Sequence, residues 1–134
     1  MAKYKKKLDA DIRCPLEYGL TIFGGKSGEY PQKLYKALMN SQTVLTVWDD
    51  ARLVGLIRVL DDSEMIAQIH YVLVHPEYQG QGIAGRMVEY IKEKYKNFMY
   101  LELMPEDKNN VPFYEKHGFH VMENGAAMQI CNIN

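Results

Sequence analysis

The sequence predicts a single mixed α/β domain over residues 1–134, with a mixed, mostly antiparallel sheet of about seven strands and about four helices. Two observations predict this class. Three segments rich in β-branched residues follow one another between positions 43 and 74, separated by short polar turns, as in an antiparallel meander. The third enters a glycine-rich turn and then a segment of helical periodicity, which adds a strand–loop–helix unit to the meander.

The start of the chain carries fewer structural signals. Residues 1–10 are predicted to form a flexible N-terminal end, because the lysine-rich run from 3 to 7 suits a solvated terminus. A short strand is expected over 11–14, where Pro15 ends it. A short amphipathic helix is expected over 16–23, since a pair of glycines follows it.

A helix and three strands follow. Pro31 suits the first turn of a helix, and Leu34 and Leu38 give the i, i+4 apolar spacing, so this helix should end near Asn40. Alternation and β-branched content then predict three successive strands, over 43–48, 53–60 and 65–74.

The second half opens with a further helix and strand. Residues 83–95 form one amphipathic helix, whose apolar face is Met87, Val88, Ile91 and Tyr95. Its other face is a solvated stripe of charged residues. Residues 98–104 read as a strand that ends at Pro105.

The last part of the chain is predicted to contain a helix and a hairpin. A short helix over 110–117 is capped by Gly118, a residue that tolerates the left-handed conformation of a helix C-terminus. Two strands over 119–122 and 126–131 flank the dipeptide Asn124-Gly125, which favours a tight hairpin turn.

Composition excludes several functional classes. Hydrophobic residues make up 47% and charged residues 25%, with a net charge of −1, so we expect a globular protein with no nucleic-acid footprint. No apolar run is long enough for a membrane helix or a signal peptide, so we expect no membrane partner. Cys14 and Cys131 suit a reducing compartment, and the expected location is cytoplasmic. The histidines and cysteines lack metal-ligand spacing, so no metal is expected.

The glycine-rich turn between the predicted strand and helix can cradle an anion. Glycine lets the backbone approach a phosphate, and the N–H groups and dipole of a helix N-terminus favour negative charge. The spacing Gly80, Gly82, Gly85 is neither of the two common nucleotide fingerprints. A glycine-rich turn also occurs in α/β proteins that hold no ligand, so this feature alone leaves both interpretations open.

Two motifs resemble one family. Gln79, Gly82 and Ala84 match the Q/R-x-x-G-x-G/A pyrophosphate loop of the GNAT N-acetyltransferase superfamily. The later stretch 113–119 matches its F-Y-x-K-x-G-F motif at every position. Within this superfamily, the motif sequences resemble most those of small bacterial members and of the arylalkylamine N-acetyltransferase branch. The resemblance implies the acetyl-CoA N-acyltransferase fold along nearly the whole chain.

The resemblance implies that acetyl-CoA binds as the acyl-donor substrate. Its amides would extend the strand before the loop at Val72 to Val74, and a bulge there would expose an N–H for the thioester oxygen. Its pyrophosphate would lie on the backbone of the loop, with a charge-assisted bond from the arginine of the first helical turn. The residues implied are Val72, Leu73, Val74, Gln79, Gly80, Gln81, Gly82, Ile83, Ala84, Gly85 and Arg86.

The resemblance also implies catalytic residues. Tyr114 would act as the general acid, since a phenol near the sulfur can stabilise or protonate the leaving thiolate. His70, which matches a strand histidine of the arylalkylamine branch, is the first candidate base, and Glu102 is the second; water stays a third choice. Two departures weaken the match: Gln68 replaces a second strand histidine, and Asp107 replaces a cofactor-binding asparagine.

These observations favour an N-acetyltransferase that moves the acetyl group to a primary amine by direct attack in a ternary complex. We expect the amine acceptor to be a small molecule. Alternatives are acetylation of a protein amine and an acyl-CoA-binding or sensing module without turnover. A DNA-binding regulator is a further alternative, which the charge balance disfavours. The resemblance also allows a homodimer. The sequence does not identify the acceptor amine.

Overall fold

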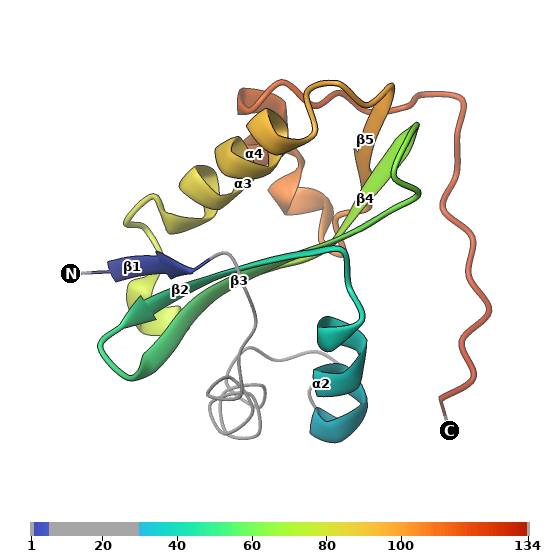
Figure 1. Ribbon diagram of the computed structural model, residues 1–134. Helices are drawn as coiled ribbons and strands as arrows, with labels where there is room; N and C mark the ends of the chain where they lie inside the picture. The colour runs from blue at the N-terminus through green and yellow to red at the C-terminus, as the bar shows by residue number, and fades with distance from the viewer. Residues whose placement is uncertain (1, 6–29, 134) are drawn as a thin grey trace. The chain divides into compact units, whose positions relative to one another are not determined.

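The computed structural model describes residues 2–5 and 30–133 (Figure 1). The predicted strand over 11–14 and helix over 16–23 lie outside the described residues. The chain divides into two compact units, Met1–Leu103 and Met104–Asn134, and each is described here by itself.

The first unit is built on one sheet, in which the strand order equals the chain order, β1-β2-β3-β4-β5. The first four strands pair antiparallel, whereas β4 and β5 pair parallel. The mixed α/β class is therefore confirmed, although the described residues hold five strands and three α-helices rather than about seven and four. The strands are β1 (Ala2–Lys5), β2 (Thr43–Asp49), β3 (Arg52–Asp61), β4 (Ile66–Val74) and β5 (Tyr100–Leu103).

The predicted flexible end at residues 1–10 is wrong for Ala2–Lys5, which forms β1 at the edge of the sheet. Ala2 pairs with Asp49 and Lys5 with Thr46. Edge pairing needs only backbone N–H and C=O groups from one neighbour, and lysine-rich sequences are common at sheet edges. The lysine-rich sequence of this segment therefore does not predict whether it forms an edge strand.

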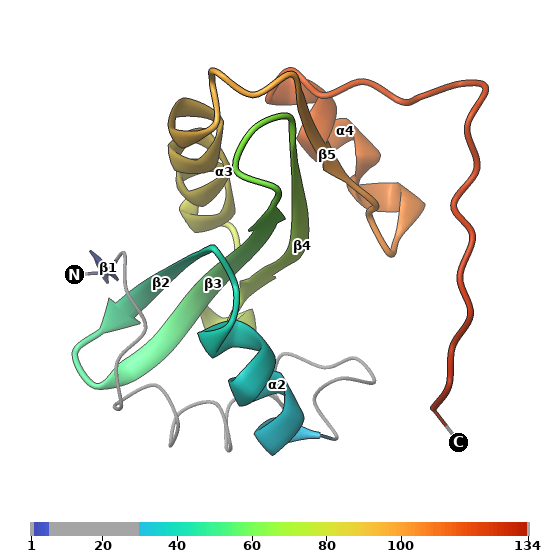
Figure 2. The same cartoon turned by 45° about the vertical axis from the view of Figure 1, so that its right-hand side comes forward.

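Helix α2 (Pro31–Met39) lies on one face of the sheet, and helix α3 (Ile83–Lys94) on the opposite face (Figures 1 and 2). Proline occupies the first turn of α2, as predicted, and the helix ends at Asn40. Leu34 and Leu38 are buried, so the i, i+4 stripe faces the sheet. The core cluster on this face is Leu34, Leu38, Val44, Trp48, Leu53 and Leu56.

Helix α3 buries the four residues predicted for its apolar face, Met87, Val88, Ile91 and Tyr95. The hydroxyl of Tyr95, just past the helix, lies 2.6 Å from Thr43 Oγ1 and donates to Asp61 Oδ2, also at 2.6 Å. Burial, followed by the bond to Asp61, raises the pKa of Tyr95 to about 12. One buried phenol therefore fastens the C-terminal end of α3 to β2 and β3.

The second unit contains the 3-10 turn η4 (Lys108–Asn110) and helix α4 (Val111–Lys116). Gly118 has φ of 93°, which confirms the predicted cap after α4. Beyond it, residues 119–133 contain no strand, so the predicted hairpin over 119–122 and 126–131 is wrong.

The predicted hairpin turn on Asn124-Gly125 does not form. Gly125 N–H instead donates to Met122 O at 3.1 Å, which closes a turn centred on Glu123 and Asn124. The apolar side chains on either side are exposed, Met128 by 93% and Ile130 by 88%. An isolated hairpin is marginal in water unless one face is buried, and here no such burial accompanies the turn.

Candidate functional site

The loop that follows β4 is held by its own backbone. His75 N–H donates to Val54 O at 2.8 Å, so the chain stays paired with β3 one residue past the strand. The short turn η3 (Pro76–Tyr78) begins there, and His75 Nδ1 accepts from Glu77 N–H at 3.1 Å. These bonds make His75 a structural residue of the turn that follows β4.

The β2–β3 hairpin turn braces the same loop through side chains. The Tyr78 hydroxyl donates to the Asp49 carboxylate, and this hydrogen bond is the main reason that the pKa of Tyr78 is raised. Arg52 forms an exposed ion pair with Glu77 at 2.8 Å. The phenol bond positions the loop, whereas an exposed ion pair contributes only about 0–1 kcal/mol.

Two glycines then turn the chain into α3. Gly80 and Gly82 have φ of 82° and 83°, a left-handed conformation that side chains disfavour, and Gly82 is the N-cap of the helix. Arg86 N–H donates to Gly82 O at 3.1 Å, and no side chain of the described residues caps this helix N-terminus. Gln79 Nε2 donates back to Val74 O at 3.2 Å and closes the loop. The geometry is that of an anion cradle of backbone N–H groups.

A glycine in β3 sets how closely α3 approaches the sheet. An added Cβ at Gly55 would lie 3.1 Å from Ile83 Cγ2 and 3.2 Å from Val47 Cβ. Ile83 is the first residue of α3, so the missing side chain of Gly55 lets the cradle sit directly on β3. The sequence offered one signal for this role, a glycine inside a predicted strand.

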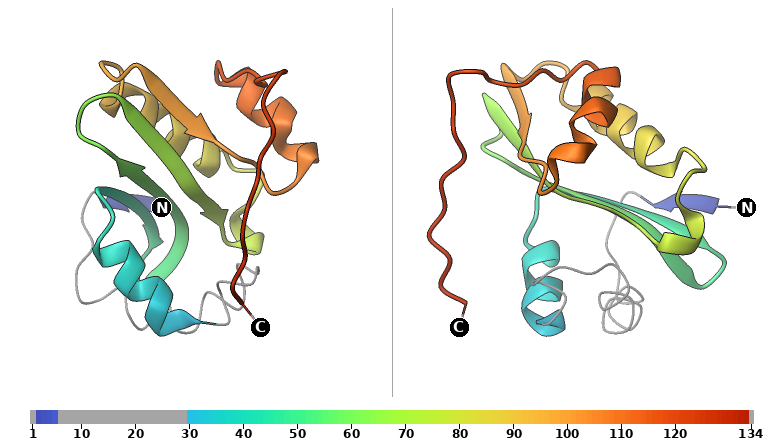
Figure 3. Two further views of the ribbon diagram at one scale, coloured as in Figure 1. Left: turned by 90° about the vertical axis from the view of Figure 1, so that its right-hand side faces the viewer. Right: turned by 180° about the vertical axis from the view of Figure 1, so that it is seen from behind.

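Beside the cradle, β4 extends past β5. The last parallel pair is Ile69 with Leu103, where β5 ends, whereas β4 continues to Val74 (Figure 3, left). Among the described residues, the strand that pairs with 71–74 is β3. The other edge of Val72, Leu73 and Val74 therefore offers backbone groups to which an extended ligand can bind.

A bulge interrupts β4, but not where it was expected. Tyr71 pairs with Arg58 and Ile69 with Val59, so His70 has no residue opposite it. Pairing over 72–74 is regular, and the expectation of a bulge there is wrong. The bulge lies where β4 parts from β5, a position set by two ladders together and invisible in the local sequence.

The two candidate bases lie in the first unit, and strand register places Glu102 on the sheet face that packs against α2. Glu102 is half-buried and pairs with Gln68, whereas His70 is exposed. The Arg58 side chain joins them on this face, because Arg58 pairs with Val44 of the α2 core cluster. Arg58 Nη1 lies 2.8 Å from His70 Nδ1. Sequence reasoning missed Arg58; a cation within an apolar strand was the available signal.

The candidate acid lies in the second unit. Tyr114, in α4, packs edge-on against Phe113 and Phe119, with ring centroids 5.0 and 6.0 Å away. Burial raises the pKa of its phenol, so the group keeps its proton at neutral pH. Asp107, for which no cofactor role was assigned, caps η4 by accepting from Asn109 N–H at 2.9 Å.

The first unit thus brings together every predicted cofactor-binding residue and both candidate bases. Within residues 2–5 and 30–133, no group of three or more His, Cys, Asp or Glu side chains could hold a metal ion. None of the helices in that same part of the chain has the length and apolarity needed to cross a bilayer.

Comparisons with known proteins agree on one family. The model of the acetyltransferase (GNAT) family matches residues 16–119 of the 134. An uncharacterised N-acetyltransferase of Bacillus methanolicus is 34% identical over 117 residues, which are 87% of this chain and 92% of that protein. Two other curated N-acetyltransferases are longer, and the matched regions span 55% and 29% of their lengths.

Solved structures share the whole fold. A probable acetyltransferase of Staphylococcus aureus has a TM-score of 0.82 at 28% identity, covering 98% of this chain and 99% of that one. A predicted acetyltransferase of Clostridium acetobutylicum, solved with acetyl-CoA, has a TM-score of 0.69 at 16% identity and covers 96% of each chain. The family match over most of the sequence and these relatives establish that the chain belongs to the acetyltransferase (GNAT) family.

Proposed function

We propose that this protein transfers the acetyl group of acetyl-CoA to the primary amine of a small molecule, by direct attack in a ternary complex. One observation carries the proposal. The first unit places the Gly80–Gly82 cradle at the N-terminus of α3, next to the stretch of β4 that β5 leaves unpaired. A ligand with an anionic pyrophosphate and an extended amide arm matches both features at once.

The donor would bind mostly to backbone. The amides of its pantetheine arm would pair with Val72 to Val74, and its pyrophosphate would accept bonds from N–H groups between Gly80 and Arg86. The exposed Arg86 side chain adds charge. That a Clostridium acetobutylicum protein of the same fold was solved with acetyl-CoA supports acetyl-CoA as the ligand.

The chemistry follows from the leaving group. The amine nitrogen attacks the thioester carbon, a C–N bond forms, and the C–S bond breaks with its electron pair going to sulfur. The thiolate takes the proton of Tyr114, and the phenolate recovers one from the new ammonium nitrogen. A general acid must reach the reaction protonated, and the Tyr114 phenol, whose pKa burial raises, meets that condition at neutral pH.

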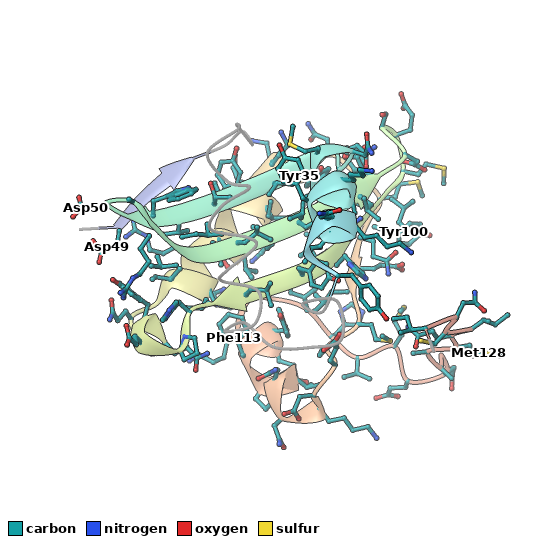
Figure 4. The ribbon with its side chains drawn as sticks, turned by 90° about the horizontal axis from the view of Figure 1, so that it is seen from below. Tyr35, Asp49, Asp50, Tyr100, Phe113 and Met128 are labelled. Atoms are coloured by element: carbon teal, nitrogen blue, oxygen red, sulfur yellow. The ribbon has the colours of Figure 1, made fainter. Side chains whose placement is uncertain are left out.

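The acceptor must lose a proton before attack, and the two candidate bases for this step are His70 and Glu102. Both lie on the sheet face that α2 covers in part, together with Gln68. Register places exposed apolar side chains on the same face, where Figure 4 labels Tyr100. They are Leu60, Ile66 and Tyr100. Apolar side chains around a carboxylate suit a small amine with an apolar body.

The test is release of thiol from acetyl-CoA with a panel of small amines and short peptides. We expect release with small amines, and at least a tenfold loss in Tyr114→Phe, about 1.4 kcal/mol of barrier. Tyr90→Phe, a phenol of α3, is the matched control and should keep the rate. Equal rates in Tyr114→Phe and wild type would remove Tyr114 from the mechanism.

Two further outcomes separate the alternatives. Release with peptides but not with small amines would assign a protein acceptor. Tight acetyl-CoA binding without release from any acceptor would favour the sensing module. In either case binding should weaken in Arg86→Ala but not in Lys92→Ala, whose side chain pairs with Glu89.

A further inference from the structure

An ordered chain of hydrogen bonds ends on His70. Ser41 Oγ donates to Ala37 O at 2.7 Å, at the C-terminal end of α2. Arg58 Nε donates to Ser41 Oγ at 2.8 Å, and Arg58 Nη1 lies 2.8 Å from His70 Nδ1. Helix α2 therefore sets the position of the guanidinium, and the guanidinium meets one particular nitrogen of the imidazole.

The chemistry of the two groups decides the proton positions. A guanidinium carries N–H donors and no acceptor, so His70 Nδ1 must accept with its lone pair. An imidazole that accepts at Nδ1 is neutral and carries its proton on Nε2. Burial lowers the pKa of Arg58, but an arginine stays charged at neutral pH, so the donor persists.

The bulge explains why this contact exists. Tyr71 pairs with Arg58, and His70 is the extra residue of β4. The His70 ring packs edge-on against Tyr71 at 4.4 Å, and the Arg58 guanidinium carbon lies 5.7 Å from the Tyr71 ring centroid. The additional residue thus places the imidazole beside the Arg58 guanidinium of β3, whereas regular alternation would direct this side chain to the opposite face of the sheet.

We propose that Arg58 is a positioning residue, which holds His70 as a neutral Nε2–H donor and leaves removal of the acceptor's proton to the carboxylate of Glu102. Only the role of Glu102 as the base rests on the proposed function. Before the transfer, the alkylammonium form of the acceptor gives one proton to Glu102, and the neutral amine then attacks the thioester carbon. His70 loses and gains no proton.

Within residues 30–133, three strands bring charged and titratable groups toward His70. Arg58 contributes from β3 and Tyr71 from β4, while Glu102 lies on β5, one register step away opposite Gln68. A nearby cation opposes protonation of the imidazole, whereas a carboxylate favours it. Because Arg58 Nη1 lies at hydrogen-bond distance from His70 Nδ1, we expect the cation to outweigh a carboxylate on the next strand.

The first test is independent of turnover. Long-range proton–nitrogen NMR of the ¹⁵N-labelled full chain, with His70→Gln for assignment, should show a pyrrole-type Nε2 and a pyridine-type Nδ1. In Arg58→Met the ring should protonate at higher pH and exchange between tautomers, and Arg58→Lys should restore part of the wild-type behaviour. Arg52→Met, a cation elsewhere on β3, should change nothing at His70. An Nδ1–H tautomer in wild type, or identical titrations in wild type and Arg58→Met, would overturn the tautomer assignment.

The second test uses pH–rate profiles with an amine that turns over. Glutamine keeps a side-chain N–H donor but cannot serve as a base. The kcat of His70→Gln should therefore drop less than tenfold, and its rate should still fall at acidic pH. The kcat of Glu102→Gln should drop at least tenfold, and its rate should no longer fall at acidic pH. The reverse pattern makes His70 the base and refutes the proposal. If no amine turns over, the proposed function fails, and the NMR result still decides the role of Arg58.

Discussion

Substituting Gly55 by alanine tests whether close packing of α3 on β3 builds the acetyl-CoA site. The new Cβ would meet Ile83 Cγ2 at 3.1 Å and Val47 Cβ and Cγ2 at 3.2 and 3.3 Å, where ordinary contacts begin near 3.4 Å. Val47 is fully buried in β2 and pairs directly with Gly55, so it cannot move without moving the strand. The remaining way to relieve the contact is to move Ile83, and with it the first turn of α3.

The magnitude follows from two opposing effects. Overpacking a filled core costs about 1–3 kcal/mol, and replacing a strand glycine by alanine returns about 0.5–1 kcal/mol. The net loss of roughly 0–2.5 kcal/mol should lower the melting temperature by up to about 10 °C in a domain of this size. Acetyl-CoA should bind about tenfold more weakly, because one misaligned charge-assisted hydrogen bond costs about 1.5 kcal/mol.

Thermal unfolding and calorimetric titration with acetyl-CoA measure both quantities on the same samples. Gly125→Ala is the control, because its Cβ would meet Met122 O at an ordinary 3.6 Å. Removing Cγ2 with Ile83→Ala should make the second substitution at Gly55 cost less than it does alone. Wild-type stability and affinity in Gly55→Ala would refute the claim that this glycine sets the height of the cradle.

Three further outcomes follow from the geometry. Gly82→Ala places a side chain at φ of 83° with nothing within 4 Å, so unfolding should show a loss of about 1–2 kcal/mol from backbone strain alone, and titration should show weaker acetyl-CoA binding. Tyr95→Phe should lose about 1–2 kcal/mol at pH 7 by denaturant unfolding. Because the folded pKa of Tyr95 is raised to about 12 from 10, its protonated form stabilises the fold below pH 10, and that stability should disappear between pH 10 and 12 in wild type but not in the variant. Tyr78→Phe removes the bond to Asp49, so acetyl-CoA affinity should fall several-fold with little change in melting temperature; a change confined to stability would contradict a role in positioning the loop.

Features encoded by neighbouring residues were predictable from sequence. Apolar spacing and a first-turn proline located α2, and the pattern of Met87, Ile91 and Tyr95 located α3 and its buried face. The glycines that turn the chain between β4 and α3 were visible for the same reason, since positive φ depends on the residue itself. Strands β2, β3 and β4 followed from alternation and short turns.

Tertiary structure alone decided the features that join distant residues. Pairing with β2 makes Ala2–Lys5 a strand despite its lysines, and the absence of a buried partner face leaves 119–131 unpaired despite the Asn124-Gly125 dipeptide. The bulge at His70 depends on the registers of two ladders, and the contact of His70 with Arg58 depends on that bulge. The sequence by itself determined the local conformations and the family motifs. Which nitrogen of His70 holds the proton is decided by a residue on another strand, because hydrogen-bond partners in a sheet are set by register and not by proximity along the chain.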